Sequence, residues 1–139
     1  MSDKAVYGSK AWVALLGGLA RRLLAEAGSP QSRFTLIERL LNAPADGQPA
    51  PPLEAGYRLD IAAGEARVRF GVGPDEVADA WVDVDYPTGV KLCRLTSGAA
   101  LDALSAEAKE KGLIVVRGDV AASPIDLTAL HDAIVPLTR

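Results

Sequence analysis

The stretch that decides the fold is Gly112–Asp119, which reads GLIVVRGD. Four consecutive aliphatic residues, Leu113–Val116, predict a central strand that is buried on both faces of a sheet. Gly118 predicts a turn after this strand, because glycine adopts backbone conformations that other residues avoid. Ser123 and Pro124 follow in the order favoured at a helix start, an N-cap residue and then proline. The apolar positions of this last helix are Leu127, Leu130, Ile134 and Leu137.

Two other interpretations of this stretch meet objections. Arg117, Gly118 and Asp119 form an adhesion tripeptide, but the sequence shows neither a secretion signal nor a pair of cysteines. A phosphate site at a strand–turn–helix junction needs backbone amides at the helix start. Here Asp119 adds a negative charge and Pro124 lacks the amide hydrogen. We therefore expect a structural turn that leads into a helix folded back over the core.

The composition is typical of one globular domain that spans residues 1–139, with 49% apolar and 24% charged residues. The net charge of −3 argues against a nucleic-acid partner. A single cysteine, Cys93, excludes an internal disulfide, and with one histidine the chain lacks the ligands for structural zinc. The apolar run Ala11–Ala20 is too short to span a bilayer and meets two arginines where a signal peptide would be cleaved. We expect a cytoplasmic protein.

The first 43 residues are predicted to be helical. Leucines at helical spacing predict one helix over Ser9–Ala27. Ser32 is a candidate N-cap for a second helix over Phe34–Leu41. Residues 44–55 are rich in proline and predict a loop. A sheet with its covering helices is expected over residues 56–139.

This helical segment is basic, whereas the remainder of the chain is acidic. Residues 1–43 carry six basic and three acidic side chains, and residues 44–139 carry nine and fifteen, so the charges are +3 and −6. The simplest interpretation is that the arginines form the solvated faces of two helices. Two alternatives are transient contact with an anionic membrane surface through these helices and docking on a partner or a second copy. In the docking alternative, the protein is an interaction or dimerisation module with a filled core and no ligand. Its sign would be that Trp12, Leu16 and Leu19 are exposed in the monomer.

Alternating apolar and charged residues predict three strands. The first two, Tyr57–Ala62 and Arg67–Val72, are joined by a hairpin turn, and the third is Ala80–Asp85. Asp83 and Asp85 fall on the charged face, where cross-strand pairs with arginines predict a solvated charge ladder instead of an acid–base pair. The apolar face needs a cover, and its residues are Leu59, Ile61, Val68, Phe70, Val82 and Val84.

Two predicted helices precede the opening stretch. The first includes Val90, Leu92, Cys93 and Leu95 and ends at Gly98. The second begins at Ala99, turns Leu101 and Leu104 inward and ends at Gly112. Together with the last helix they are expected to cover the apolar face of the sheet.

No catalytic constellation is evident in the sequence. His131 lies beside the apolar stripe of the last helix, and Cys93 is predicted to be an inert core thiol. Gly71–Gly73 is followed by proline and does not continue as a dinucleotide-binding fingerprint. An enzyme would have to gather Asp83, Asp85 and His131 in one pocket. We therefore expect no enzymatic activity, no cofactor and no metal.

The chain from Ala78 to Leu137 resembles the sterol carrier protein type 2 (SCP2) family. The features that carry the resemblance are the strand ADAWVDV, the helix VKLCRLTSG, a second helix, and GLIVVRGD before an apolar terminal helix. The predicted hairpin falls where the family has its first two strands. The resemblance implies an α+β fold in which about five mostly antiparallel strands are covered on one face by helices. Four strands are evident from the residues, so the fifth is unassigned.

The resemblance also implies a carrier function without catalytic residues. Family members bind fatty acids, fatty acyl-CoA, sterols or other lipids in an apolar tunnel, and some bacterial members carry lipid intermediates of isoprenoid quinone synthesis. We therefore expect a hydrophobic small-molecule ligand in an apolar cavity between sheet and helices. The same residues would also build a filled core, so volume decides between the two. The predicted cavity residues are Val82, Val84, Leu92, Leu95, Leu104, Val115, Leu127, Leu130 and Ile134.

Overall fold

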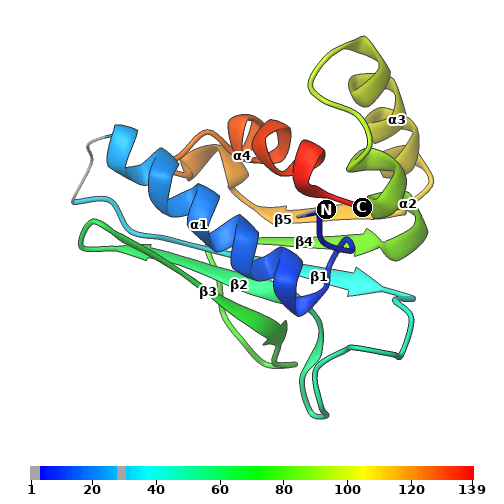
Figure 1. Ribbon diagram of the computed structural model, residues 1–139, viewed down its shortest axis with the longest axis horizontal. Helices are drawn as coiled ribbons and strands as arrows, with labels where there is room; N and C mark the ends of the chain where they lie inside the picture. The colour runs from blue at the N-terminus through cyan, green and yellow to red at the C-terminus, as the bar shows by residue number, and fades with distance from the viewer. Residues whose placement is uncertain (1–3, 28–30) are drawn as a thin grey trace.

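An open five-stranded sheet carries helices on one face in the computed structural model, which describes residues 4–27 and 31–139 (Figure 1). The strand order is β3-β2-β1-β4-β5. Strand β1 pairs antiparallel with β2 and parallel with β4, and the two outer pairs are antiparallel. These features confirm the predicted α+β fold with a mostly antiparallel five-stranded sheet. The strands are β1 (Phe34–Leu41), β2 (Glu54–Ala62), β3 (Glu65–Val72), β4 (Ala80–Asp85) and β5 (Ile114–Gly118).

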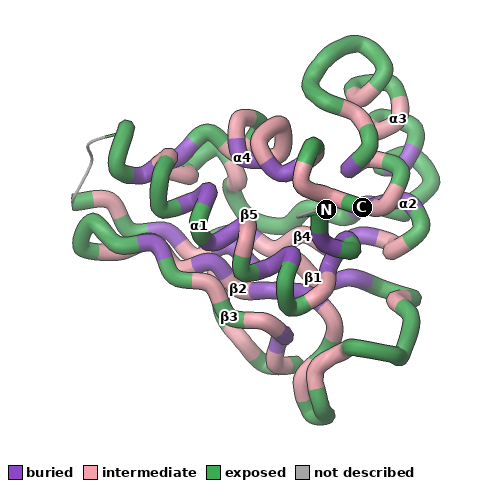
Figure 2. The backbone as a smooth tube through the Cα atoms, in the orientation of Figure 1, coloured by how far each residue is buried: buried purple, intermediate pink, exposed green. Residues whose placement is uncertain are grey.

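In the described part of the chain, four helices cover the sheet or extend from it. Helix α1 lies over β2 and β3 and beside α4, whereas α3 extends from the end of the molecule (Figure 1). Figure 2 shows the buried residues concentrated along the strands beneath α1 and α4, and α3 buries only Ala108. The helices are α1 (Lys10–Ala27), α2 (Tyr86–Leu92), α3 (Ala99–Glu110) and α4 (Leu127–Ile134), with short 3-10 turns at Val120–Ala122 and Val135–Leu137. Among the residues described, no helix is both long and apolar enough to cross a membrane.

The prediction of a helix over Phe34–Leu41 is wrong, because this segment is β1, the central strand of the sheet. Its apolar residues fit helical spacing because residues on both faces of the strand are buried, by the helices on one face and beside Arg58 and Trp81 of the neighbouring strands on the other. Leu36 faces the helices, whereas Ile37 is fully buried on the opposite face, so strict alternation is lost. Arg39, expected on a solvated helix face, lies on this strand instead. Strand β1 is the fifth strand that the sequence left unassigned.

The prediction that Leu113–Val116 form a central strand buried on both faces is also wrong. Strand β5 is an edge strand that pairs only with β4. Ile114 is buried, but Val115 and Val116 are 44% and 40% exposed. A run of aliphatic residues predicts a strand without specifying how many neighbours it has. The turn at Gly118 is confirmed, because its φ is +81° and a Cβ there would lie 2.1 Å from the carbonyl oxygen of Asp79.

The last helix begins later than the sequence predicts. Asp126, and not Ser123, is the N-cap of α4, and its carboxylate accepts from the amides of Thr128 and Ala129. The hydroxyl of Ser123 instead donates to the carbonyl of Ile125 at 2.7 Å.

The apolar face of α1 is buried within the monomer. Trp12, Leu16 and Leu19 are 3%, 2% and 9% exposed, so the exposed apolar patch expected of a docking module is not formed by these residues. The helix approaches β3 closely at Gly17, where a Cβ would lie 2.4 Å from a methyl carbon of Val68. The first predicted helix is thus confirmed as a layer of the core.

The open face of the sheet carries the predicted charge ladder. Arg39 donates two hydrogen bonds of 3.0 Å to Asp83, which also lies 3.5 Å from Arg117. Arg58 bridges Asp60 and Glu76 in the neighbouring part of the face. The expectation that Asp83 is solvated is wrong, because this residue is only 9% exposed. These ion pairs confirm that Asp83 has a structural partner on the face away from the helices.

Candidate functional site

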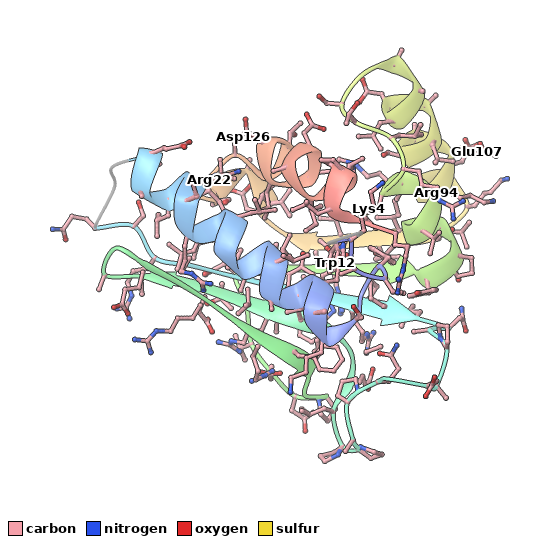
Figure 3. All side chains as sticks on the ribbon, in the orientation of Figure 1. Lys4, Trp12, Arg22, Arg94, Glu107 and Asp126 are labelled. Atoms are coloured by element: carbon pink, nitrogen blue, oxygen red, sulfur yellow. The ribbon has the colours of Figure 1, made fainter. Side chains whose placement is uncertain are left out.

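A pocket of about 230 Å³ lies between the sheet and helices α1, α2 and α4. Most of its wall is apolar. The aliphatic side chains come from the helix-facing side of β1, β4 and β5 and from all three helices, and Trp12 of α1 adds an aromatic surface. Trp12 lies in the middle of the molecule, whereas Arg22 on the same helix points outward (Figure 3).

Six of the nine predicted cavity residues line this pocket. They are Val82, Val84, Leu92, Leu127, Leu130 and Ile134. Val82 and Val84 alternate on the helix-facing side of β4, and the other four come from α2 and α4. Strand alternation and helical spacing therefore brought these residues together as expected. Their contact with a ligand stays a prediction.

Leu95, Leu104 and Val115 do not line the pocket. Val115 pairs with Asp83 across β4 and β5, which places it on the open face of the sheet. Leu104 belongs to α3, which extends away from the sheet. Leu95 contributes its backbone carbonyl, which accepts from His131, but not its side chain. The error at Val115 follows from treating β5 as an interior strand.

Three polar side chains meet at the pocket wall, and the sequence analysis did not identify them as a site. Glu38 projects from the middle of β1 toward the helices, and Tyr57 lies opposite it on β2. The Tyr57 hydroxyl donates to Oε2 of Glu38 at 2.8 Å. The Tyr7 hydroxyl, from the segment before α1, donates to Oε1 at 3.4 Å. Together they form a carboxylate–phenol cluster, by which we mean Glu38, Tyr7 and Tyr57.

Packing fixes the orientation of both tyrosines. The rings of Tyr7 and Trp12 meet edge to face, with centroids 5.1 Å apart. The Tyr7 hydroxyl also lies against Gly89 of α2, where a Cβ would be 2.3 Å away. Tyr57 is held by its register with Glu38 and is 4% exposed. The cluster is therefore built by β1, β2, α1 and α2 together.

Burial dominates the protonation equilibria of this cluster. It raises the pKa of Glu38, while hydrogen bonds from Tyr57 and Tyr7 and the charge of His131 act in the opposite direction. Burial and the nearby Glu38 carboxylate raise the pKa of both tyrosines well above their usual value. Burial also raises the pKa of Cys93 to about 12. Both phenols and the thiol therefore stay protonated at neutral pH.

Two other polar side chains of the pocket wall, Trp12 and His131, form hydrogen bonds with other residues of the protein. Nε1 of Trp12 donates to Oγ1 of Thr138 at 2.9 Å. Nε2 of His131 lies 2.7 Å from the carbonyl oxygen of Leu95, and because a carbonyl only accepts, Nε2 carries the hydrogen. Of the residues that the structure describes, none that lines the pocket is a lysine or an arginine.

The three residues that the sequence offered as candidates for catalysis, Asp83, Asp85 and His131, do not share one pocket. Asp83 lies on the open face, and Asp85 caps α2 by accepting from the amide and hydroxyl of Thr88. Of these three residues, only His131 lines the pocket. Within residues 4–27 and 31–139, no three His, Cys, Asp or Glu side chains are grouped so that they could hold a metal ion.

The signal that could have revealed the cluster is a charged residue on an apolar strand face. In FTLIERLL, the buried residues Phe34, Leu36 and Leu40 alternate with period two, and Glu38 occupies the one remaining position of that face. This alternation was missed because Phe34–Leu41 was predicted to be a helix. Tyr57 was placed correctly on the apolar face, but its hydroxyl needs a polar partner there.

Comparison with solved structures identifies the fold. No family model matches the chain, and no curated protein matches it. A crystal structure of sterol carrier protein 2 aligns with a TM-score of 0.59 and 16% identity over 96% of this chain and 99% of that one. The UbiJ-SCP2 ubiquinone synthesis protein aligns with a TM-score of 0.52 and 17% identity over 88% and 86% of the two chains.

Two further structures extend this comparison. A conserved hypothetical protein from Thermus thermophilus, described as possibly a sterol carrier protein, aligns with a TM-score of 0.51 and 20% identity over 98% and 93% of the chains. A sec-alkylsulfatase from Pseudomonas sp. aligns with a TM-score of 0.50 and 18% identity over 93% of this chain but 16% of its own. The chain therefore has the SCP2 fold, which confirms the structural part of the resemblance.

Proposed function

We propose that this protein is a non-enzymatic carrier or binding domain for a hydrophobic small molecule, which it holds in the pocket between the sheet and helices α1, α2 and α4. The observation that carries the proposal is the pocket itself, whose wall is apolar apart from a few polar side chains. An apolar concavity with a small number of placed polar groups is the usual form of a small-molecule site. Solved proteins of the same fold include one named as a sterol carrier.

The size of the pocket supports a ligand instead of a filled core. Protein interiors pack densely, and voids larger than a water molecule are few. An apolar cavity of about 150 Å³ already holds benzene. The pocket of about 230 Å³ exceeds that volume and lies beside side chains such as Leu130 and Ile134, which are 4% and 2% exposed. An alkyl chain or a fused ring fits its chemistry.

Native mass spectrometry of the purified protein, before and after incubation with a total lipid extract, tests this function. We expect one added mass per chain, and organic extraction should release a hydrophobic compound. The variant Val82→Phe places extra volume in the pocket and should reduce the loaded fraction. The matched variant Val115→Phe, on the open face of the adjacent strand, should leave it unchanged. A folded wild-type protein that takes up no hydrophobic compound would overturn the proposal.

A further inference from the structure

The strong hydrogen-bond donors at the pocket wall are largely engaged within the protein. Trp12 donates to Thr138 at 2.9 Å, His131 to the carbonyl of Leu95 at 2.7 Å, and Tyr57 to Glu38 at 2.8 Å. Tyr7 donates to Glu38 over a longer distance, 3.4 Å. A ligand that needs several donors, as a carboxylate does, therefore finds few available here.

Acceptors, in contrast, remain available. A carboxylate has about four lone-pair sites, and each oxygen of Glu38 receives one tyrosine hydroxyl. Glu38 is half-buried and lines the pocket, so a ligand in the pocket can reach it. Oε1 is the less engaged oxygen, since 3.4 Å is long for a hydroxyl–carboxylate bond.

A hydroxyl group matches this arrangement because it both donates and accepts. It can donate to Oε1 of Glu38 and accept from the Tyr7 hydroxyl, in place of the long bond that joins Tyr7 and Glu38 directly. The bond to Glu38 is charge-assisted when the carboxyl is ionised, which makes it stronger than a bond between neutral groups. The remainder of such a ligand would contact the apolar wall.

Among the described residues, no side chain with a permanent positive charge faces an anionic headgroup in this pocket. Among the described residues that line it there is no lysine or arginine, and the ion-paired arginines Arg39, Arg58 and Arg69 lie on the open face of the sheet. A fatty-acid carboxylate placed here would meet Glu38, and two like charges close together in an apolar site repel each other strongly.

We propose that Glu38 is the specificity-determining residue of this pocket, and that with Tyr7 it selects uncharged apolar ligands that carry a hydroxyl group over fatty acids and other anionic lipids. This inference rests on the proposed binding function and narrows it to a ligand class. Long-chain alcohols and apolar phenols share the required chemistry. Glu38 contributes by accepting a hydrogen bond and by excluding negative charge.

Competition between two ligands of equal chain length tests the inference. Decan-1-ol and decanoate are titrated at pH 8 against the neutral dye 1,6-diphenylhexatriene bound to the wild-type protein. We expect decan-1-ol to displace the dye at a concentration at least tenfold lower than decanoate, since hydrogen bonds to charged groups and like-charge repulsion each contribute on this scale. Equal affinity for the two ligands would overturn the inference.

The variant Glu38→Gln isolates the role of the carboxylate. Glutamine keeps the shape, removes the charge and adds an amide donor. Decanoate should bind the variant about tenfold more tightly than it binds the wild type, and the preference for decan-1-ol should fall below about threefold. The control Glu65→Gln, on an exposed residue of β3, should behave as wild type. An unchanged preference in a folded Glu38→Gln variant overturns the inference.

The failures of the two proposals are distinguishable. If the wild-type protein binds the dye and both ligands without preference, the binding function stands and the role of Glu38 is refuted. If it binds neither ligand nor the dye, the binding function fails and the inference fails with it. Should Glu38→Gln not fold, as judged by circular dichroism, equal affinity of the wild-type protein for decan-1-ol and decanoate still overturns the inference.

Discussion

Glu38 and Tyr57 face each other across β1 and β2, and the phenolic hydroxyl of Tyr57 donates a 2.8 Å hydrogen bond to Oε2 of Glu38 on the helix-covered face of the sheet. A carboxyl group at the centre of an apolar face has an energetic cost, because burial disfavours its charged form. The cost is reduced by hydrogen bonds from Tyr57 and Tyr7. A costly group at a pocket wall is typical of a functional position.

The stability of the protein should depend on pH through Glu38. Burial raises the pKa of Glu38 in the folded state, so the folded protein holds this proton more tightly than the unfolded chain. The resulting stabilisation is present below the unfolded-state pKa and is lost as the pH rises through the raised folded-state pKa. We compare the unfolding free energy of the wild type with that of Glu38→Gln at pH 4 and at pH 8. Between these two pH values the wild type should lose about 1.4 kcal/mol relative to the variant for each unit by which folding raises the pKa of Glu38.

Urea denaturation of wild type and Glu38→Gln at both pH values measures this difference. The other ionisable groups are common to both proteins, so the change in the difference reports Glu38. A difference that is independent of pH, or that favours the wild type at pH 8, would contradict the account.

Removal of the Asp83 carboxylate should destabilise the fold without affecting the pocket. Burial alone would raise the pKa of Asp83, but hydrogen bonds from Arg39 and Trp81 and the charges of Arg39 and Arg117 lower it below its usual value. Asp83→Ala leaves Arg39 without its closest partner and should cost about 1–3 kcal/mol of unfolding free energy. The control Glu65→Ala removes an exposed pair with Arg67 and should cost less than about 1 kcal/mol. Equal costs in urea denaturation would contradict this prediction.

Two adjacent glycines of α1 should respond to alanine in opposite directions. Helix propensity alone predicts that alanine stabilises both positions by about 1 kcal/mol. At Gly17 a Cβ would lie 2.4 Å from Val68, and this overlap should instead destabilise the protein by about 1–3 kcal/mol. At Gly18 the nearest atom is 3.8 Å away, at the end of the Arg21 side chain, so Gly18→Ala should raise the melting temperature. Stabilisation by both substitutions would show that α1 does not pack closely on β3.

The affinity for an apolar ligand should increase with its length until the pocket is full. Each buried methylene contributes about 0.8 kcal/mol, which corresponds to about a fourfold decrease in Kd. Displacement of a neutral dye by 1-alkanols from hexanol to dodecanol should follow this slope and then level off. An affinity that does not change with length would indicate binding at the surface.

The sequence predicted the parts of the fold in which one strand face is apolar and the other charged. Strands β2, β3 and β4 follow this alternation, and Val82 and Val84 consequently lie in the pocket. Strand β1 does not, because Glu38 occupies its apolar face and Ile37 is buried on the other. Glu38 therefore explains both results: it forms the polar part of the pocket, and it breaks the alternation that would have predicted β1.

The remaining errors concern long-range neighbours. The aliphatic run at Leu113–Val116 predicts a strand, but only the pairing of β5 with β4 alone places Val115 on the open face. Tyr7 and Glu38 are 31 positions apart, and no local pattern indicates their hydrogen bond. Periodicity assigns a residue to a face, whereas contact between faces depends on topology.

The most direct test of the central claim is an isothermal titration of decan-1-ol into the wild-type protein and the variants Val82→Phe and Val115→Phe. The account predicts saturable binding of one molecule per chain to the wild type and to Val115→Phe, and a loss of at least tenfold in affinity for Val82→Phe. The absence of saturable binding to the wild type, or equal binding to both variants, would contradict the account that the space between the sheet and the helices is a ligand site.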